Sequence, residues 1–300
     1  MERSAETVIR VAATAACAVL VLALLFLFGN THEPETYGPS LASWLFRQWT
    51  LPNSRSAHGW LVPCVSIFLL WRRRRELAAA ARAPCDPVLL AVVPCLLAYW
   101  AGCRTQQPRL GVLAMIALAW IVPLFLWGRD VGRRLLFPCA YLIFAVPLGF
   151  LNAVTLPLRL IATKASVGLL NGIGVRTFRA GTAIIAGDGS GLRLDVADPC
   201  SGLHSLLALT ALTAAYAALT QKTLVRKVVL FVCAVPLAMA GNIARIVVIC
   251  LAARAFGLEV AMKIYHDYSV YVLFIVAILL MTAVGALLNR IPNRHALEHK

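Results

Sequence analysis

The sequence predicts an all-α integral membrane protein that crosses the bilayer about eight times. Hydrophobic residues make up 61% of the 300 residues, charged residues make up only 14%, and the mean hydropathy is +0.81. A soluble domain averages about half apolar and a quarter charged residues. The apolar residues also fall into blocks separated by basic clusters, as in multi-pass membrane proteins. We therefore treat residues 1–300 as a single membrane domain.

Eight apolar blocks along the chain are candidate membrane spans. The second is short for a helix that needs about 20 apolar residues, so we expect it to be tilted or to start near Leu51. The blocks define a five-helix part (1–151), an extracytoplasmic segment (152–199) and a three-helix part (200–288). The eight spans are 8–28, 57–71, 88–103, 110–127, 135–151, 203–219, 228–249 and 270–288.

Basic residues indicate the orientation of these spans. Arginines and lysines are dense in the short segments 72–75, 129–134 and 222–227, whereas the short segment after the third span has only Arg104 and Arg109. Short loops rich in Lys and Arg stay in the cytoplasm, so both termini are expected inside. The net charge of +15 then reflects topology and contacts with anionic lipid rather than nucleic-acid binding.

The extracytoplasmic segment is expected to hold a small helix and a β-hairpin. Residues 156–170 are mostly aliphatic but include Arg159 and Lys164, which suits a helix along the membrane surface. Residues 175–179 and 192–197 alternate between apolar and polar, which is typical of strands. The glycine-rich stretch 187–191 between them has the composition of a turn. The second strand would lead directly into Cys200.

Cys200, Arg245 and His266 are predicted to reach the same depth at the outer boundary of the bilayer. Cys200 lies 21 residues before Gln221 of an inner loop, which is about 31 Å of helix. Arg245 lies 18 residues after Lys227 and His266 lies 24 residues before Arg290, about 27 and 36 Å of helix. These lengths approach or exceed the roughly 30 Å of the hydrocarbon core. A thiol, a guanidinium and an imidazole at one place can cut an amide bond through a thioester.

Cys200 is the candidate nucleophile, in the sequence Asp-Pro-Cys-Ser-Gly-Leu that ends at Leu203. Pro199 suits the first position of a helix and Asp198 suits its cap. Cys200 would then lie in the first turn, where the helix dipole lowers the pKa of a thiol. Ser201 follows it, but the glycine of a serine-hydrolase elbow is missing. The alternative is that Cys200 is a small packing residue.

Arg245 is the candidate transition-state stabiliser because it interrupts an apolar run. A charged residue within a transmembrane helix is costly and usually has a partner or a function. Asn242 lies one turn earlier on the same helix face, which favours a buried polar site. The alternative is an arginine that extends to lipid phosphates.

Two histidines compete for the role of general base. His266 opens the last span beside Asp267, whose carboxylate can orient an imidazole. His204 is four residues after Cys200 and shares its helix face. The residues alone leave the choice open.

The remaining motifs argue against other chemistry. The nine cysteines form no Cys-x-x-Cys pair, and the sequence lacks His-Glu-x-x-His, a P-loop and a dinucleotide fingerprint. We expect no metal and no cofactor. Paired acidic residues deep in the spans are missing as well, which argues against a proton-coupled carrier.

With these residues, the chain resembles the exosortase/archaeosortase family of membrane cysteine transpeptidases. That family has a Cys-Ser-Gly-Leu motif, an Arg preceded by Asn at minus three, and a His often followed by Asp. Cys200 to Leu203, Asn242 with Arg245, and His266 with Asp267 match that pattern in order, and the resemblance covers residues 146–288. Two positions differ: Pro199 replaces a common Ala, and His204 replaces a common Arg. The resemblance therefore favours His266 as the base and gives His204 and Ser201 supporting positions.

The resemblance implies a thioester-forming enzyme of the bacterial inner membrane with its site on the extracytoplasmic face. Its substrates would be exported proteins with a C-terminal sorting tail of the PEP-CTERM kind: a motif, a transmembrane helix and a basic end. An unknown amine would accept the released protein. Two other classes stay open, an envelope polymer transporter or flippase and a non-catalytic export scaffold.

Overall fold

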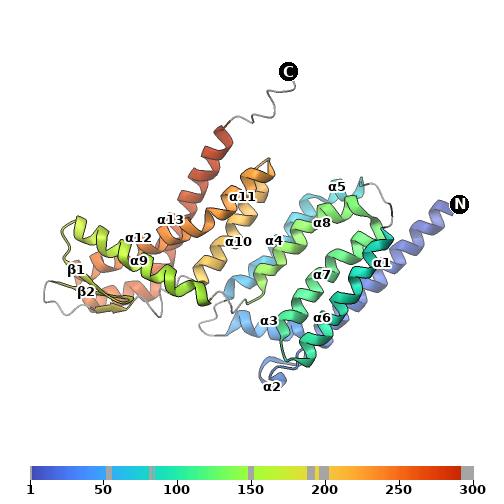
Figure 1. Cartoon of the computed structure of the whole chain (residues 1–300), viewed down its shortest axis with the longest axis horizontal. Helices are drawn as coiled ribbons and strands as arrows, with labels where there is room; N and C mark the ends of the chain where they lie inside the picture. The colour runs from blue at the N-terminus through green and yellow to red at the C-terminus, as the bar shows by residue number, and fades with distance from the viewer. Residues whose placement is uncertain are drawn as a thin grey trace. The chain divides into compact units, whose positions relative to one another are not determined.

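The structure is a computed structural model that describes residues 2–51, 56–80, 83, 85–147, 152–187, 193–195 and 203–291. The chain divides into two compact units, Met1–Leu148 and Gly149–Lys300, which we describe separately (Figure 1). Cys200 and Ser201 lie outside the described residues, and for His204, His266 and Asp267 only the backbone is described.

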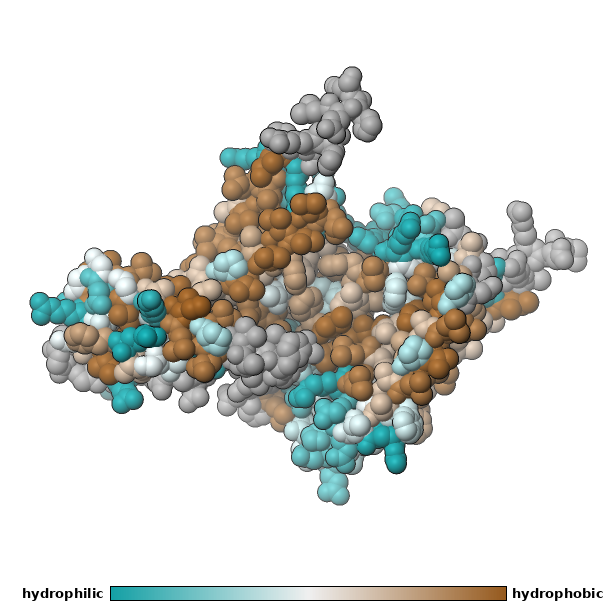
Figure 2. Space-filling model, viewed as in Figure 1, coloured by the Kyte–Doolittle hydropathy of each residue, from teal (hydrophilic) through white to brown (hydrophobic). Residues whose placement is uncertain are grey.

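Long apolar helices dominate both units, which confirms an all-α integral membrane protein. Among the described residues, five helical segments are long and apolar enough to cross a bilayer, and Leu206–Thr220 is a shorter apolar helix. Many of their large apolar side chains are exposed, as Figure 2 shows on one face, which suits contact with lipid. The five are Val8–Leu27, Pro87–Arg104, Pro108–Trp127, Leu224–Phe256 and Tyr271–Arg290.

In the first unit, helices α1, α3, α6 and α8 pack against α7 (Pro108–Trp127). Leu41 and Trp44 of α3 are fully or almost fully buried, and α3 begins with a capping box between Ser40 and Ser43. Its elements are α1 (Glu2–Leu27), α2 (Pro34–Tyr37), α3 (Leu41–Thr50), α4 (Leu61–Arg72), α5 (Arg74–Ala78), α6 (Val92–Arg104), α7 (Pro108–Trp127) and α8 (Arg129–Tyr141), with short 3-10 turns η1 (Ala57–Trp60), η2 (Asp86–Ala91) and η3 (Leu142–Ala145).

Hydrogen bonds from side chains to backbone carbonyls join distant parts of the first unit. Trp49 Nε1 donates to the carbonyl oxygen of Ala145 (2.9 Å), and Ser66 Oγ donates to that of Pro138 (2.8 Å). The second bond satisfies a hydroxyl in the middle of α4, a helix of only 12 residues. The short second span that the sequence predicts is therefore a 3-10 turn followed by this short helix.

The second unit is a helical group with a small sheet packed on it. Its elements are α9 (Asn152–Gly172), β1 (Thr177–Ala180), β2 (Ala183–Ala186), β3 (Arg193–Asp195), α10 (Leu203–Thr220), α11 (Leu224–Val232), α12 (Ala234–Phe256) and α13 (Leu258–Arg290). In Figure 1, α9 lies alongside α12, with β1 and β2 beside them. Ile184 of β2 belongs to the same buried cluster as Ile246 and Ile249 of α12.

A helix and two strands lie near the predicted positions before Cys200, but the predicted hairpin is wrong, because these two strands do not pair with each other. β1 pairs with β2 across the two-residue turn Gly181–Thr182, and β2 pairs with β3. Gly181 has φ +64°, as such tight hairpin turns require. β2 was missed because it is a continuous apolar run without alternation, which is typical of a buried central strand.

The last two helices are longer than the predicted spans 228–249 and 270–288. α12 continues to Phe256 and α13 begins at Leu258, so they form a tight hairpin around Gly257. Gly257 has φ +86°. The expectation that His266 opens the last helix is therefore wrong, because eight residues of α13 precede it. The added turns contain Arg254, Glu259 and Lys263. Hydropathy excludes these charged residues from a predicted membrane span, although the helices include them.

Candidate active site

Arg245 lies in the middle of α12 and is almost completely buried. Its exposed fraction is 4%, and that of Asn242, one turn earlier, is 6%. Ile246 and Ile249 on the same side of the helix are buried as well. The two polar side chains therefore point into the protein rather than toward lipid. This burial argues against an arginine that serves only to reach lipid phosphates.

Helix α9 covers this face of α12 and runs in the same direction. Arg254 Nη1 near the end of α12 donates to the carbonyl oxygen of Gly174, just beyond the end of α9 (3.4 Å). Ala162 and Leu170 of α9 share a buried cluster with the isoleucines of α12. Further back, Leu158 packs against the cluster that contains Ala238. Residues 158–166 of α9 therefore lie along the stretch of α12 that carries Asn242 and Arg245.

The face of α9 that meets α12 carries a polar stripe formed by Arg159, Thr163 and Ser166. Thr163 and Ser166 have no exposed surface, and Thr163 donates to the carbonyl oxygen of Arg159 (2.8 Å). On the facing sides of α9 and α12, the buried atoms Arg159 Nε, Ser166 Oγ and Asn242 Oδ1 bond to no described residue. A buried polar atom without a partner costs about 1–3 kcal/mol, so the atoms of this stripe can gain stability by bonding to water or to a substrate.

This polar stripe is not among the sites that the sequence predicts. Arg159 and Lys164 among the aliphatic residues of 156–170 suggest an amphipathic helix on the membrane surface. Lys164 is indeed exposed, but Arg159, Thr163 and Ser166 recur at spacings of four and three on the opposite, buried side. This spacing of three and four residues places the polar side chains on one helix face, and it was the feature of the sequence that could have indicated the stripe.

Helix α13 runs antiparallel to α12 and brings the backbone of His266 close to the level of Arg245. A Cβ atom added to Gly241 would be 2.8 Å from the carbonyl oxygen of Leu273, and Ala253 packs with Ala261. Counting between these contacts puts Arg245 level with position 269 of α13. His266 is three residues away, which is about 4.5 Å along the helix axis.

Helix α10 begins at this same level. Thr213 Oγ1 donates to Met281 Sδ (3.5 Å) and Gln221 Nε2 donates to the carbonyl oxygen of Gly285 (3.2 Å). α10 and α13 therefore run in the same direction. The two residues of the first pair are 68 positions apart in the sequence, and those of the second pair are 64 positions apart. Counting back from these pairs puts Leu203, the first residue of α10, level with positions 267–271 of α13. The start of α10 and Arg245 thus share one level.

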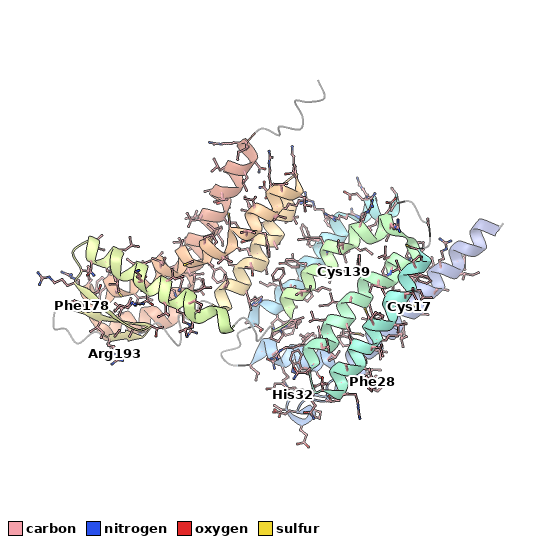
Figure 3. All side chains as sticks on the ribbon, in the orientation of Figure 1. Cys17, Phe28, His32, Cys139, Phe178 and Arg193 are labelled. Carbon is pink, nitrogen blue, oxygen red and sulfur yellow. The ribbon has the colours of Figure 1, made fainter. Side chains whose placement is uncertain are left out.

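The other eight cysteines range from buried to exposed. Cys139 and Cys250 are buried, and Figure 3 shows Cys17 and Cys139 on α1 and α8 of the first unit. Within the part of the chain that the structure describes, no group of three or more His, Cys, Asp or Glu residues is placed to hold a metal ion.

In the second unit, the start of α10, the middle of α12 and the backbone around His266 therefore lie at about one level along the packed helices, which makes this level the candidate site. In comparisons with known proteins, a family model described as transmembrane exosortase matches residues 48–283. The match covers more than half of the chain, so the chain belongs to the transmembrane exosortase family. Membership gives it the general role of a membrane transpeptidase that acts on proteins with sorting signals. No curated protein and no solved structure matched the chain.

Proposed function

We propose that the protein is a cysteine transpeptidase that removes a C-terminal sorting tail from exported proteins, with Cys200, Arg245 and His266 as its catalytic residues. The observation that carries the proposal is the shared level of Leu203, Arg245 and the backbone near His266. Cys200 precedes Leu203 by three residues in the sequence. In this proposal, three separate segments of the chain supply the thiol, the guanidinium and the imidazole.

The chemistry follows from the ordinary properties of these groups. His266 takes the proton of the Cys200 thiol, and the thiolate attacks the carbonyl carbon of the scissile amide. Arg245 donates hydrogen bonds to the oxyanion that develops. The C–N bond then breaks, the leaving amine takes a proton from His266, and the tail departs. The acyl group stays on Cys200 as a thioester, which an acceptor amine or water resolves.

Burial of Arg245 supports its proposed role. A hydrogen bond from a fixed cation to a developing oxyanion is much stronger in a dry site than in water. Asn242 is buried one turn earlier on α12 and Ser166 is buried on the facing helix α9, so in this proposal they orient the substrate through Asn242 Oδ1 and Ser166 Oγ. Asp267, Ser201 and His204 are supporting residues in this proposal, which requires neither metal nor cofactor.

The orientation of the site is also part of the proposal. With the termini inside, the polar inner loops lie opposite Cys200, so the site opens to the extracytoplasmic side of the inner membrane. An impermeant thiol reagent added to intact spheroplasts should then label Cys200. Labelling that requires opening the membrane would invert this topology.

Co-expression with an exported protein that carries a candidate tail tests the function. Wild type should remove the tail, Cys200→Ala should not, and mass spectrometry should detect a thioester at Cys200. A polymer transporter or a scaffold would keep its activity in Cys200→Ser, because neither needs a nucleophile. Normal tail removal by Cys200→Ala, with wild-type membrane abundance, would refute the proposal.

A further inference from the structure

Seven arginines gather where α4, α5 and α8 of the first unit meet. Arg72, Arg73, Arg74 and Arg75 are at the junction of α4 and α5, and Arg129, Arg133 and Arg134 are in α8. We call these seven residues the arginine cluster. Its segments contain no lysine and only two carboxylates, Glu76 and Asp130, which leaves a formal excess of five positive charges. Figure 2 shows a hydrophilic patch over α5 and the start of α8.

Several of these side chains are held in place by other groups. Arg73 Nη1 donates to the carbonyl oxygen of Arg134 (3.1 Å), which ties the end of α4 to α8. Arg134 Nη1 lies 3.5 Å from Glu76 Oε2. Arg74 lies over the ring of Trp71 at 4.3 Å and donates to its carbonyl oxygen (3.1 Å). Each guanidinium has five N–H donors, so several donors on these fixed groups remain for a ligand.

The start of α8 adds a further preference for an anion. The helix begins at Arg129 after Gly128, which has no side chain to cap the first N–H groups. A helix N-terminus favours negative charge, yet Arg129 and Arg133 place positive charge there and Asp130 offsets only part of it. A bound anion would relieve this repulsion and accept hydrogen bonds from the free N–H groups.

Apolar side chains next to the cluster indicate what carries the anion. Trp71 is 58% exposed, Phe68 is 46% exposed and Ile67 is 64% exposed, and all three are on α4 just before the arginines. The rings of Phe68 and Trp71 are stacked with centroids 6.3 Å apart. Exposed aromatic rings beside basic residues are characteristic of the membrane–water boundary. The ligand should therefore have both a charged group and acyl chains.

We propose that the arginine cluster binds the headgroup phosphate of an anionic phospholipid, with the acyl chains along the exposed face of α4. Orientation in the membrane requires only positive charge, which lysine and arginine supply equally. A phosphate site differs from such a topology signal because it favours arginine. Arginine, unlike lysine, can hold a phosphate through two parallel hydrogen bonds. The proposal does not depend on the catalytic function.

The test measures binding of phosphatidylglycerol to the purified full-length protein in phosphatidylcholine nanodiscs, by native mass spectrometry. Arg73→Lys/Arg134→Lys keeps every charge and should weaken binding about tenfold, the loss of roughly one bidentate contact. Lys222→Gln/Lys227→Gln removes two charges from the second unit and should change binding less than about twofold. Arg72→Lys/Arg75→Lys changes two exposed arginines and should also weaken binding, so the test stands if the first variant fails to fold.

Two results would overturn the proposal. Wild-type phosphatidylglycerol binding in both lysine variants would mean that charge alone matters and that no built site exists. Displacement of the lipid by an equal concentration of inorganic phosphate would mean that the cluster binds a soluble anion instead. Loss of tail cleavage is not a readout here, so a failed catalytic proposal would leave this result unaffected.

Discussion

Gln221 joins the helix that follows Cys200 to the helix that contains His266. Its Nε2 donates to the carbonyl oxygen of Gly285 at 3.2 Å, and the side chain is 97% buried, with an exposed fraction of 3%. The bond lies at the end of α10 opposite to Cys200. It therefore fixes the register of α10 on α13, which in turn determines the level at which the start of α10 meets Arg245.

Gln221→Glu should break this register in a pH-dependent way. An ionised carboxylate would face the carbonyl oxygen of Gly285, so we expect a loss of about 2 kcal/mol or more at pH 7. Burial raises the pKa of the introduced carboxyl, and the protonated form can donate to the same carbonyl. The lost stability should therefore return as the pH falls toward 4. Lys222→Gln lowers the net charge by the same one unit at the neighbouring exposed position and should unfold like the wild type. Equal thermal unfolding of both variants at pH 7 would contradict the role of Gln221.

Gly241→Ala should separate α12 from α13 one turn before Arg245. The new Cβ would be 2.8 Å from the carbonyl oxygen of Leu273, a backbone atom that cannot move without the helix. Overpacking of this kind typically costs about 1–3 kcal/mol, and the displaced Arg245 should reduce tail cleavage at least tenfold. The matched control is Gly168→Ala in α9, where a Cβ meets nothing within 4 Å. If both variants cleave at the wild-type rate, close contact of the two backbones is not needed for the site.

Arg245→Lys should be nearly as damaging as Arg245→Ala, with a loss of about 10²–10³ in cleavage rate. Lysine keeps the charge but loses the planar fork that can bind an oxyanion and a thiolate together. Arg254→Lys is the control, because Arg254 is exposed on the same helix and donates to the carbonyl oxygen of Gly174. The measurement is the cleavage rate at equal membrane abundance. Near-normal turnover of Arg245→Lys would mean that only the charge of this residue matters.

Cys200 should be the only cysteine that activity needs. Its predicted position at a helix start favours the thiolate, whereas Cys139 and Cys250 are buried. A variant with the other eight cysteines changed to Ala or Ser should keep tail cleavage, provided that it inserts into the membrane. Inactivity of that well-inserted variant, together with activity of Cys200→Ala, would assign the nucleophile to another cysteine.

Local patterns in the sequence predict much of this fold, and specific physical causes explain what they miss. Asn242 and Arg245 in an apolar run predict a buried polar pair, because lipid would make their exposure costly, and both are buried. The extension of α12 and α13 was not predictable in the same way. Hydropathy identifies the part of a helix that lies within the bilayer and not the ends of the helix. Arg254 and Glu259 are in helices that continue past the apolar run.

It is harder to predict from the sequence which residues a polar side chain contacts. Ser166 is fully buried only because α9 packs along α12, and that packing depends on residues more than 70 positions apart. No local pattern in 156–170 shows which face of the helix another helix will cover. The same limit applies to β2, whose apolar run shows burial but not the order of the strands.

His266 should be essential and His204 only modulatory. The family pattern has its histidine at the position of His266, and its members commonly carry Arg at the position of His204. Arginine is not a base at neutral pH, so the reaction does not require a base there. The structure adds that the backbone of His266 is within about one helical turn of the level of Arg245.

His204→Arg should therefore retain much of the activity, and His266→Ala should abolish acylation, because a thiol without a base is mostly protonated at neutral pH. The measurement is the amount of enzyme–substrate thioester in each variant, with tail cleavage as a second readout. His58→Gln is a useful control, because His58 belongs to the first unit and its Nε2 lies 3.1 Å from the carbonyl oxygen of Phe144. A normal thioester in His266→Ala and none in His204→Arg would make His204, four residues after Cys200, the catalytic base.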